Sequence, residues 1–254
     1  MEKYISNIGA VNYSFEDYYG KSSMLIFFKG CNIRCNYCYN WRLVFGQSMM
    51  SNSDIERLLH RDLTFIDSIV LTGGEPTIYP YDYLCELISI FKDKYPHIKV
   101  KLDTNCVKHE TVNKLIDNKM IDAIGIDIKA DFNIDSMKKV FFDNEEVAKM
   151  VINGVVSVME RIKYNINNFD LVDFRTIVHK HFSDNTINNI KSKIESYCGR
   201  FDYETESEQY LKLYEKRLDK SGKVIYRIRR VETPKTLLLK DVVDKDGNLI
   251  ENVA

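Results

Sequence analysis

The chain has 254 residues, of which 44% are hydrophobic and 29% are charged, so it can bury a sizeable core, and a wholly disordered protein is excluded. Its formal net charge of -1 excludes a global positive field that would attract nucleic acid or an anionic membrane. The N-terminal stretch lacks the basic start and long apolar run of a secretory signal, so we expect a cytoplasmic protein without a membrane span.

Short apolar runs alternate with segments of helical periodicity along most of the chain, which predicts a parallel sheet covered by crossover helices. The expected strands are residues 23–28, 68–72, 98–103, 123–127 and 171–178. The expected helices are residues 54–60, 81–94, 109–118, 145–164 and 185–197. This repeat suits either a doubly wound open sheet or a full or partial (βα) barrel, and periodicity alone does not choose between them.

The pattern changes near residue 199. A helix-like segment, 208–218, precedes two runs that are broken by Ser221-Gly222 and by Asp246-Gly247, both of which are hairpin turn signals. We therefore predict a core of residues 1–198 and an extension of residues 199–254, which contains one last strand or helix and a small antiparallel part. We interpret the basic, aromatic run 226–230 as an exposed edge strand protected by charge, with phosphate binding as the alternative.

Three cysteines, Cys31, Cys35 and Cys38, fall within eight residues directly after the first predicted strand. Three thiolates at this spacing can bind one face of an iron-sulfur cluster and leave one iron free to chelate a small molecule. The alternative is structural zinc, which normally requires four protein ligands. The loop contains no histidine, so zinc would need a fourth ligand from a distant cysteine or histidine.

Polar motifs also end the next three predicted strands. The motif Thr72-Gly73-Gly74-Glu75-Pro76 contains two glycines that let the backbone approach a ligand closely. The third strand ends in Asp103-Thr104-Asn105. Asp127 and Lys129 end the fourth, where side chains two residues apart share a face.

Each of these motifs alone also suits an ordinary turn or a solvated strand end. Their shared position at the carboxyl ends of strands favours a barrel, because (βα) barrels form their active sites there. In the fifth strand, Arg175 needs a partner if it is buried, and Asp173 or a ligand carboxylate could provide one.

The spacing of Cys31, Cys35, Tyr37 and Cys38 resembles the cluster motif of radical S-adenosylmethionine (SAM) enzymes. The resemblance implies an α/β fold, a partial (βα)6 TIM-like barrel with a small C-terminal antiparallel extension. It implies that the three cysteines hold a [4Fe-4S] cluster at which SAM is reductively cleaved to a 5'-deoxyadenosyl radical. The cofactor-binding residues that we predict are Tyr37, Gly73, Gly74, Glu75, Pro76, Asp103, Thr104, Asp127, Lys129 and Arg175. Of these, Asp103, Thr104 and Asp127 are also expected to frame a monovalent cation.

Within this family, stretches between Tyr13 and about Val178 resemble the activating enzymes of glycyl-radical enzymes, of the anaerobic ribonucleotide reductase type. This implies a glycyl-radical enzyme as protein substrate and an electron donor of the flavodoxin or ferredoxin type. The alternatives are radical SAM modification of a small molecule, nucleotide or ribosomal peptide, and a non-catalytic zinc or cluster module, which leaves the strand-end motifs unexplained. Three departures concern substrate choice: Tyr39 replaces the usual His, Cys106 replaces the usual Gly, and residues 199–254 replace the usual ending.

Overall fold

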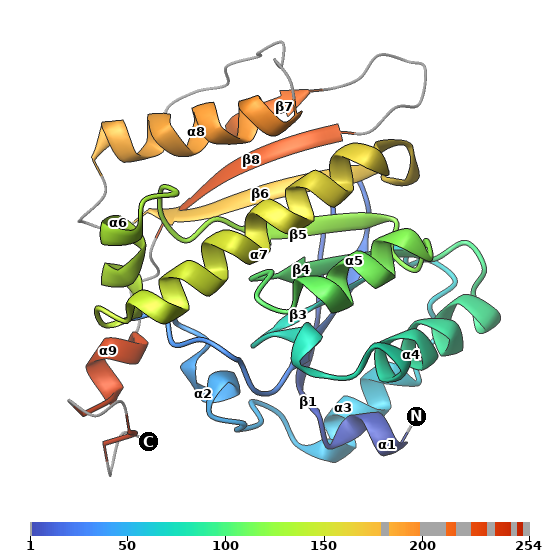
Figure 1. The fold of residues 1–254 in the computed structure, drawn as a ribbon. Coiled ribbons are helices and arrows are strands. Elements are labelled where there is room, and N and C mark those ends of the chain that lie inside the picture. The colour runs from blue at the N-terminus through green and yellow to red at the C-terminus, as the bar shows by residue number, and fades with distance from the viewer. Residues whose placement is uncertain are drawn as a thin grey trace.

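The computed structural model describes residues 2–178, 183–198, 212–216, 225–232, 237–244 and 248–250. Its centre is one eight-stranded sheet in the order β1-β2-β3-β4-β5-β6-β8-β7 (Figure 1). The five predicted strands are present, and each pairs in parallel with the next. They are β2 (Ser23–Phe28), β3 (Ser68–Gly73), β4 (Lys99–Thr104), β5 (Ala123–Asp127) and β6 (Leu171–Val178).

The five predicted helices are also present, and four of them lie in the connections between successive parallel strands. They are α3 (Asn52–Leu59), α4 (Tyr81–Lys94), α5 (His109–Asp117), α7 (Glu145–Tyr164) and α8 (Asp184–Cys198). Because the parallel strands follow one another in sequence order, their crossovers fall on one face of the sheet (Figure 1). This is the arrangement of a barrel and not of a doubly wound sheet, and no pairing of β1 with β7 closes it among the described residues. No described helix has the length and apolar character needed to cross a bilayer.

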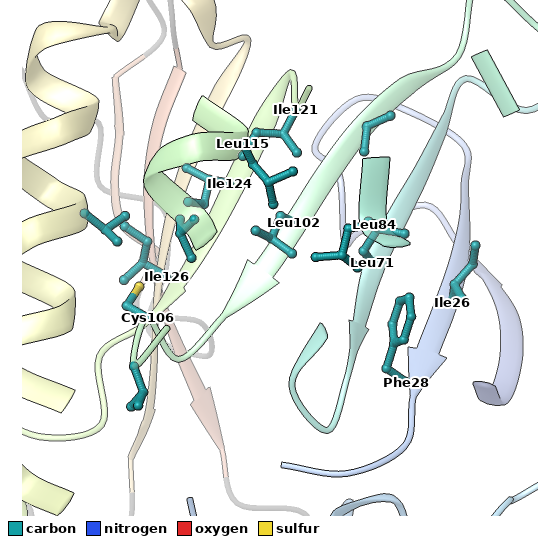
Figure 2. Packing of buried hydrophobic residues seen from close by; sticks show 14 of the residues in the cluster. Ile26, Phe28, Leu71, Leu84, Leu102, Cys106, Leu115, Ile121, Ile124 and Ile126 are labelled. Carbon is teal, nitrogen blue, oxygen red and sulfur yellow. The ribbon is translucent and has the colours of Figure 1, made fainter. Parts of the chain in front are cut away.

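The helix-facing side of the sheet carries the main apolar core. Leu71, Leu102 and Ile124 project from β3, β4 and β5 and pack with Leu84 of α4 and Leu115 of α5, all of them fully buried (Figure 2). Leu71, Leu102 and Ile124 point to the helix-facing side because successive side chains of a strand alternate between its two faces. Burial of such a side chain stabilises the fold by about 1.5–3 kcal/mol.

The other face lines the barrel interior, which changes from apolar to polar along the strands. The lowest row of the parallel register contains Leu25, Val70, Lys101, Ala123 and Leu171, and its four apolar side chains form a small cluster with Tyr18. The next row contains Phe27, Thr72, Asp103, Gly125 and Asp173. The interior therefore becomes polar toward the carboxyl ends of the strands, where a ligand site is expected.

The first strand of the sheet was missed by the sequence analysis. β1 (Ile8–Ser14) pairs antiparallel with β2 and places an extra strand before the barrel. Four of its residues are buried in succession, so it lacks the alternation of buried and exposed positions that marks a strand in the sequence.

Two predictions in the C-terminal region were wrong. The segment 208–218, predicted as helical, contains strand β7 (Lys212–Lys216), because pairing with β8 (Ile225–Glu232) overrides local helical spacing. The run 226–230 is not an edge: β8 is parallel to β6 on one side and antiparallel to β7 on the other. The predicted turns at Ser221-Gly222 and Asp246-Gly247 lie outside the described residues.

Candidate active site

The cysteine loop leaves the end of β2 and leads into α2 (Trp41–Val44). Its three cysteines line one cavity at the carboxyl ends of the strands. The loop is anchored at Gly30, whose N–H donates to the Leu43 carbonyl at 2.6 Å and whose carbonyl accepts from the Glu75 N–H at 2.9 Å. The sequence motif therefore becomes a fixed loop that presents three thiols to a common space.

The two glycines after β3 lie against this loop. Gly74 donates its N–H to the Phe28 carbonyl at 2.9 Å. A Cβ atom at this position would overlap the carbonyl oxygen of Gly30. Since Gly73 and Gly74 also line the cavity, they bring a backbone edge beside the cysteines that no larger residue would permit.

Glu75 and Pro76 support the site from behind and do not line the cavity. Pro76 begins a short 3-10 helix, η1 (Pro76–Ile78). The Glu75 carboxylate accepts hydrogen bonds from the Thr104 hydroxyl at 2.9 Å and the Asn105 N–H at 2.7 Å. Burial raises the pKa of Glu75 in spite of these bonds. The carboxylate therefore ties the ends of β3 and β4 together.

Six charged side chains form a network of alternating sign across the barrel, and its last two members line the cavity. It runs through Asp173, Lys101, Asp103, Arg175, Asp127 and Lys129, with successive N···O distances of 3.2, 3.0, 2.6, 2.8 and 2.9 Å. The three carboxylates and three cations of this network cancel, so the network carries no net charge. Gly125 makes room for this network, because a Cβ atom there would overlap Oδ1 of Asp103.

The outermost pair of the network faces the thiols. Burial opposes ionisation of Asp127, but the charges of Arg175 and Lys129 outweigh it and hold the pKa of Asp127 at about 2. The same pairing raises the pKa of Lys129 against its own burial, so the ammonium stays charged. That charge acts on the thiols, because it lowers the pKa of Cys35 and Cys38 against the larger effect of burial.

Burial nonetheless dominates at each thiol. It raises the pKa of Cys31 to about 12 and raises those of Cys35 and Cys38 above their usual value. The metal-free thiols are therefore protonated near neutral pH, and metal binding must release these protons.

The donor set fits a three-thiolate cluster. Among the described residues, the cavity lining contains no histidine and no fourth cysteine. In the described segments, no three His, Cys, Asp or Glu side chains converge on one ion position, as a single tetrahedral metal would require. A cluster does not need this convergence, because its thiolates bind separate irons. The buried Nδ2 of Asn32 in the same loop has no hydrogen-bond partner in the described structure, so a bound group could accept from it.

The predicted residues divide into two sets. Those that line the cavity are Cys31, Cys35, Tyr37, Cys38, Gly73, Gly74, Asp127 and Lys129. Glu75, Pro76, Asp103, Thr104 and Arg175 lie outside that lining and hold it in place. Arg175 contacts Asp103 and Asp127, while Asp173, its expected partner, contacts Lys101.

Two residues of the site were not among the predicted cofactor-binding residues. Asn105 lines the cavity and its Nδ2 lies 3.7 Å from the Cys31 sulfur and 2.8 Å from Oδ1 of Asn32. The sequence placed Asn105 in the motif that ends the third strand, but gave it no role. The second residue, Lys101, is fully buried. The sequence feature that could have indicated it is the pair of opposite charges, Lys101 and Asp103, on alternate positions of an apolar strand.

The sequence profile of the Radical SAM superfamily matches residues 25–190, which contain the cysteine loop and every residue predicted for the site. The chain belongs to the radical SAM superfamily. It is a radical SAM enzyme, and membership implies a [4Fe-4S] cluster and SAM as cofactors, for which the three thiols are present.

Relatives of this radical SAM enzyme include activating enzymes. A protein of Methanocaldococcus jannaschii, named as a candidate glycyl-radical enzyme activating enzyme, is 35% identical over 159 residues, 62% of this chain and 62% of that protein. The anaerobic ribonucleoside-triphosphate reductase-activating protein of Enterobacteria phage T4 is 32% identical over 45% of this chain and 75% of its own length. A 7-carboxy-7-deazaguanine synthase of Geobacter sulfurreducens is 28% identical over 43% of this chain and 50% of its own length. The match to the first relative thus spans less than two thirds of that protein.

Proposed function

We propose that this radical SAM enzyme holds its cluster on Cys31, Cys35 and Cys38, binds SAM at the adjoining strand ends, and installs a glycyl radical on a partner enzyme. The observation that carries the proposal is that the three thiols, the two glycines after β3 and the Lys129 ammonium line one cavity. When bound, the cluster supplies the electron that cleaves SAM to methionine and a 5'-deoxyadenosyl radical.

The residues around the cavity would bind and orient SAM. The methionine part of SAM is a zwitterion, and the cavity presents Asp127 and Lys129 side by side at 2.9 Å. The Asp127 carboxylate is fixed in turn by Arg175 at 2.8 Å, so the pair has a set orientation. Gly73 and Gly74 offer backbone groups to the amino group, and Tyr37, only 3% exposed, provides a ring for the adenine.

A monovalent cation framed by Asp103, Thr104 and Asp127 is a further part of the proposal. Arg175 already bridges the two carboxylates, at 2.6 Å from Asp103 and 2.8 Å from Asp127, so a cation would compete with its guanidinium. We expect turnover of SAM to be higher in potassium than in choline buffers if a cation binds, and equal in both if Arg175 keeps this position.

The test of the proposed activity uses anaerobic enzyme with SAM, reductant and a candidate glycyl-radical enzyme. We expect a glycyl doublet in the EPR spectrum of the partner, and none with the Cys35→Ala variant. Formation of 5'-deoxyadenosine without any protein radical would contradict the activase assignment.

The electron source is tested by replacing the chemical reductant dithionite with a donor of the flavodoxin or ferredoxin type. Cys31, Cys35, Cys38, Cys85 and Cys106 are free thiols, which suits the reducing cytoplasm that we propose as the location.

Radical modification of a small molecule, nucleotide or ribosomal peptide is the second candidate. The relative named as a 7-carboxy-7-deazaguanine synthase favours it, as does the apolar part of the cavity wall formed by Val44 and Ile177. Consumption of such a compound in step with 5'-deoxyadenosine formation, with no partner protein present, would select this function.

A further inference from the structure

The second half of the cysteine loop is held by two segments that are remote in sequence. On one side, the Asn36 N–H donates to the Val140 carbonyl at 2.8 Å. On the other, the Leu239 N–H donates to the Cys38 carbonyl at 2.8 Å, and the Lys240 N–H donates to the Asn36 carbonyl at 3.0 Å. Helix α9 (Leu239–Val242) thus contacts the loop directly, and Figure 1 shows it near α2.

Apolar side chains reinforce this contact. Leu239 and Val242 are fully buried and form a cluster with Trp41 that is separate from the main core. Cys38 packs against the same cluster. The third cysteine of the motif therefore has the cavity on one side and α9 on another.

The segment that carries α9 is internally bonded, so it docks as one piece. The Leu238 N–H donates to Oδ2 of Asp241 at 2.9 Å at the start of the helix. Beyond the helix, Val243 pairs antiparallel with Leu249, and the Ile250 N–H donates to the Val242 carbonyl at 2.9 Å. We call residues 238–244 and 248–250 the C-terminal cap.

We propose that the C-terminal cap is a positioning element that holds Cys38 in place as a cluster ligand and slows loss of the cluster. The part that concerns the cluster rests on the proposed function. The loop can open only after two backbone hydrogen bonds break and the buried side chains of Leu239 and Val242 return to water. A ligand loop that is held shut in this way is preorganised for the cluster.

The test compares Leu239→Asp with Leu237→Asp, the same change at a position that is 51% exposed. In the reduced, metal-free protein, we expect Leu239→Asp to increase the alkylation rate of Cys38 by about tenfold or more, from the lost burial of one leucine. Leu237→Asp should leave the rate at that of the unaltered protein. Equal rates in the two variants would overturn the proposal.

Val242→Ala is the milder variant, in case Leu239→Asp lowers the melting temperature of the whole chain. We expect it to increase Cys38 alkylation in the same direction by a smaller factor, while Cys85, on α4, reacts at an unchanged rate. If the alkylation rates of Cys38 and Cys85 rise together, the proposal is also overturned, because the variant would then have destabilised the whole chain.

The reconstituted protein gives a second readout. Iron release to a chelator should be faster in Leu239→Asp than in Leu237→Asp, and equal release would overturn the role in cluster retention. If the unaltered protein takes up no iron and sulfide at all, the proposed function fails, whereas the alkylation result still decides whether the cap holds the loop.

Discussion

Lys129 is the basic side chain that lines the cavity together with the three thiols. Its charge favours the thiolate form of Cys35 and Cys38, which is the form that binds iron. We expect Lys129→Met to lower iron uptake during anaerobic reconstitution, and to lower SAM cleavage by at least about tenfold, the loss of roughly 1.4 kcal/mol of charge stabilisation. Lys114→Met, at an exposed position of α5, is the control and should behave as the unaltered protein.

Asp127 makes folding sensitive to acid. Its pKa is lowered to about 2 in the folded protein, so the stability that it contributes is complete above its ordinary pKa near 3.8 and is lost as pH falls through about 2. We expect Asp127→Asn to remove on the order of 2 kcal/mol of this acid-dependent part of the free energy of unfolding. Denaturant titrations between pH 5 and pH 2 measure it, with Asp135→Asn, at an 80% exposed carboxylate, as the control. Parallel pH profiles for Asp127→Asn and the unaltered chain would show that Asp127 is not stabilised by its partners.

The residues of the site differ in how far the sequence alone could predict them. The cysteines were predicted as cluster ligands from their spacing, whereas Gly73-Gly74 alone indicates only a turn and was assigned through the family resemblance. The structure places both motifs at one cavity. The partners of Arg175 were not predictable from its own strand. Asp127 lies on the neighbouring strand β5 and Asp103 lies on β4, one strand further away, so the contacts depend on register and on the space that Gly125 leaves between them.

At the scale of elements, the turn between β4 and α5 carries a strained residue. Cys106 has φ 64° and is fully buried. A left-handed backbone strains most side chains and β-branched ones most of all. We expect Cys106→Gly to change the free energy of unfolding by less than about 1 kcal/mol, because relief of strain offsets the lost thiol packing, and Cys106→Val to cost about 2 kcal/mol or more.

Chemical denaturation of the two variants measures this difference. Cys85→Val, on helix α4 with ordinary backbone geometry, should cost less than Cys106→Val. Similar losses for both valine variants would mean that backbone conformation does not limit the choice of residue at Cys106.

Elements with a strong local pattern were predicted and those defined by distant contacts were not. Helix α7 has the predicted bounds, because apolar residues recur on one face along its whole length and Asn144 caps its start by accepting from the Val147 N–H. The strand β7 was predicted as a helix, since only its pairing with β8 makes it extended. The contact of α9 with the cysteine loop has no local signature at all.

At the scale of the whole molecule, the barrel is layered along its axis. An apolar floor that includes Leu25 and Leu171 supports the neutral network of charges, and this network supports the cavity with the cysteines. Charged side chains can be buried at this level because each has a partner of opposite sign. The layers explain how residues from four strands and a loop come together at one site.

The proposed chemistry depends on a cluster that three cysteines bind and that leaves one iron free for SAM. EPR spectroscopy of the anaerobically reconstituted, reduced enzyme, before and after addition of SAM, tests this most directly. We expect about four irons and four sulfides per chain and a cluster signal whose g values shift when SAM is added. A chain that binds one zinc instead, or a cluster signal that SAM leaves unchanged, would contradict it.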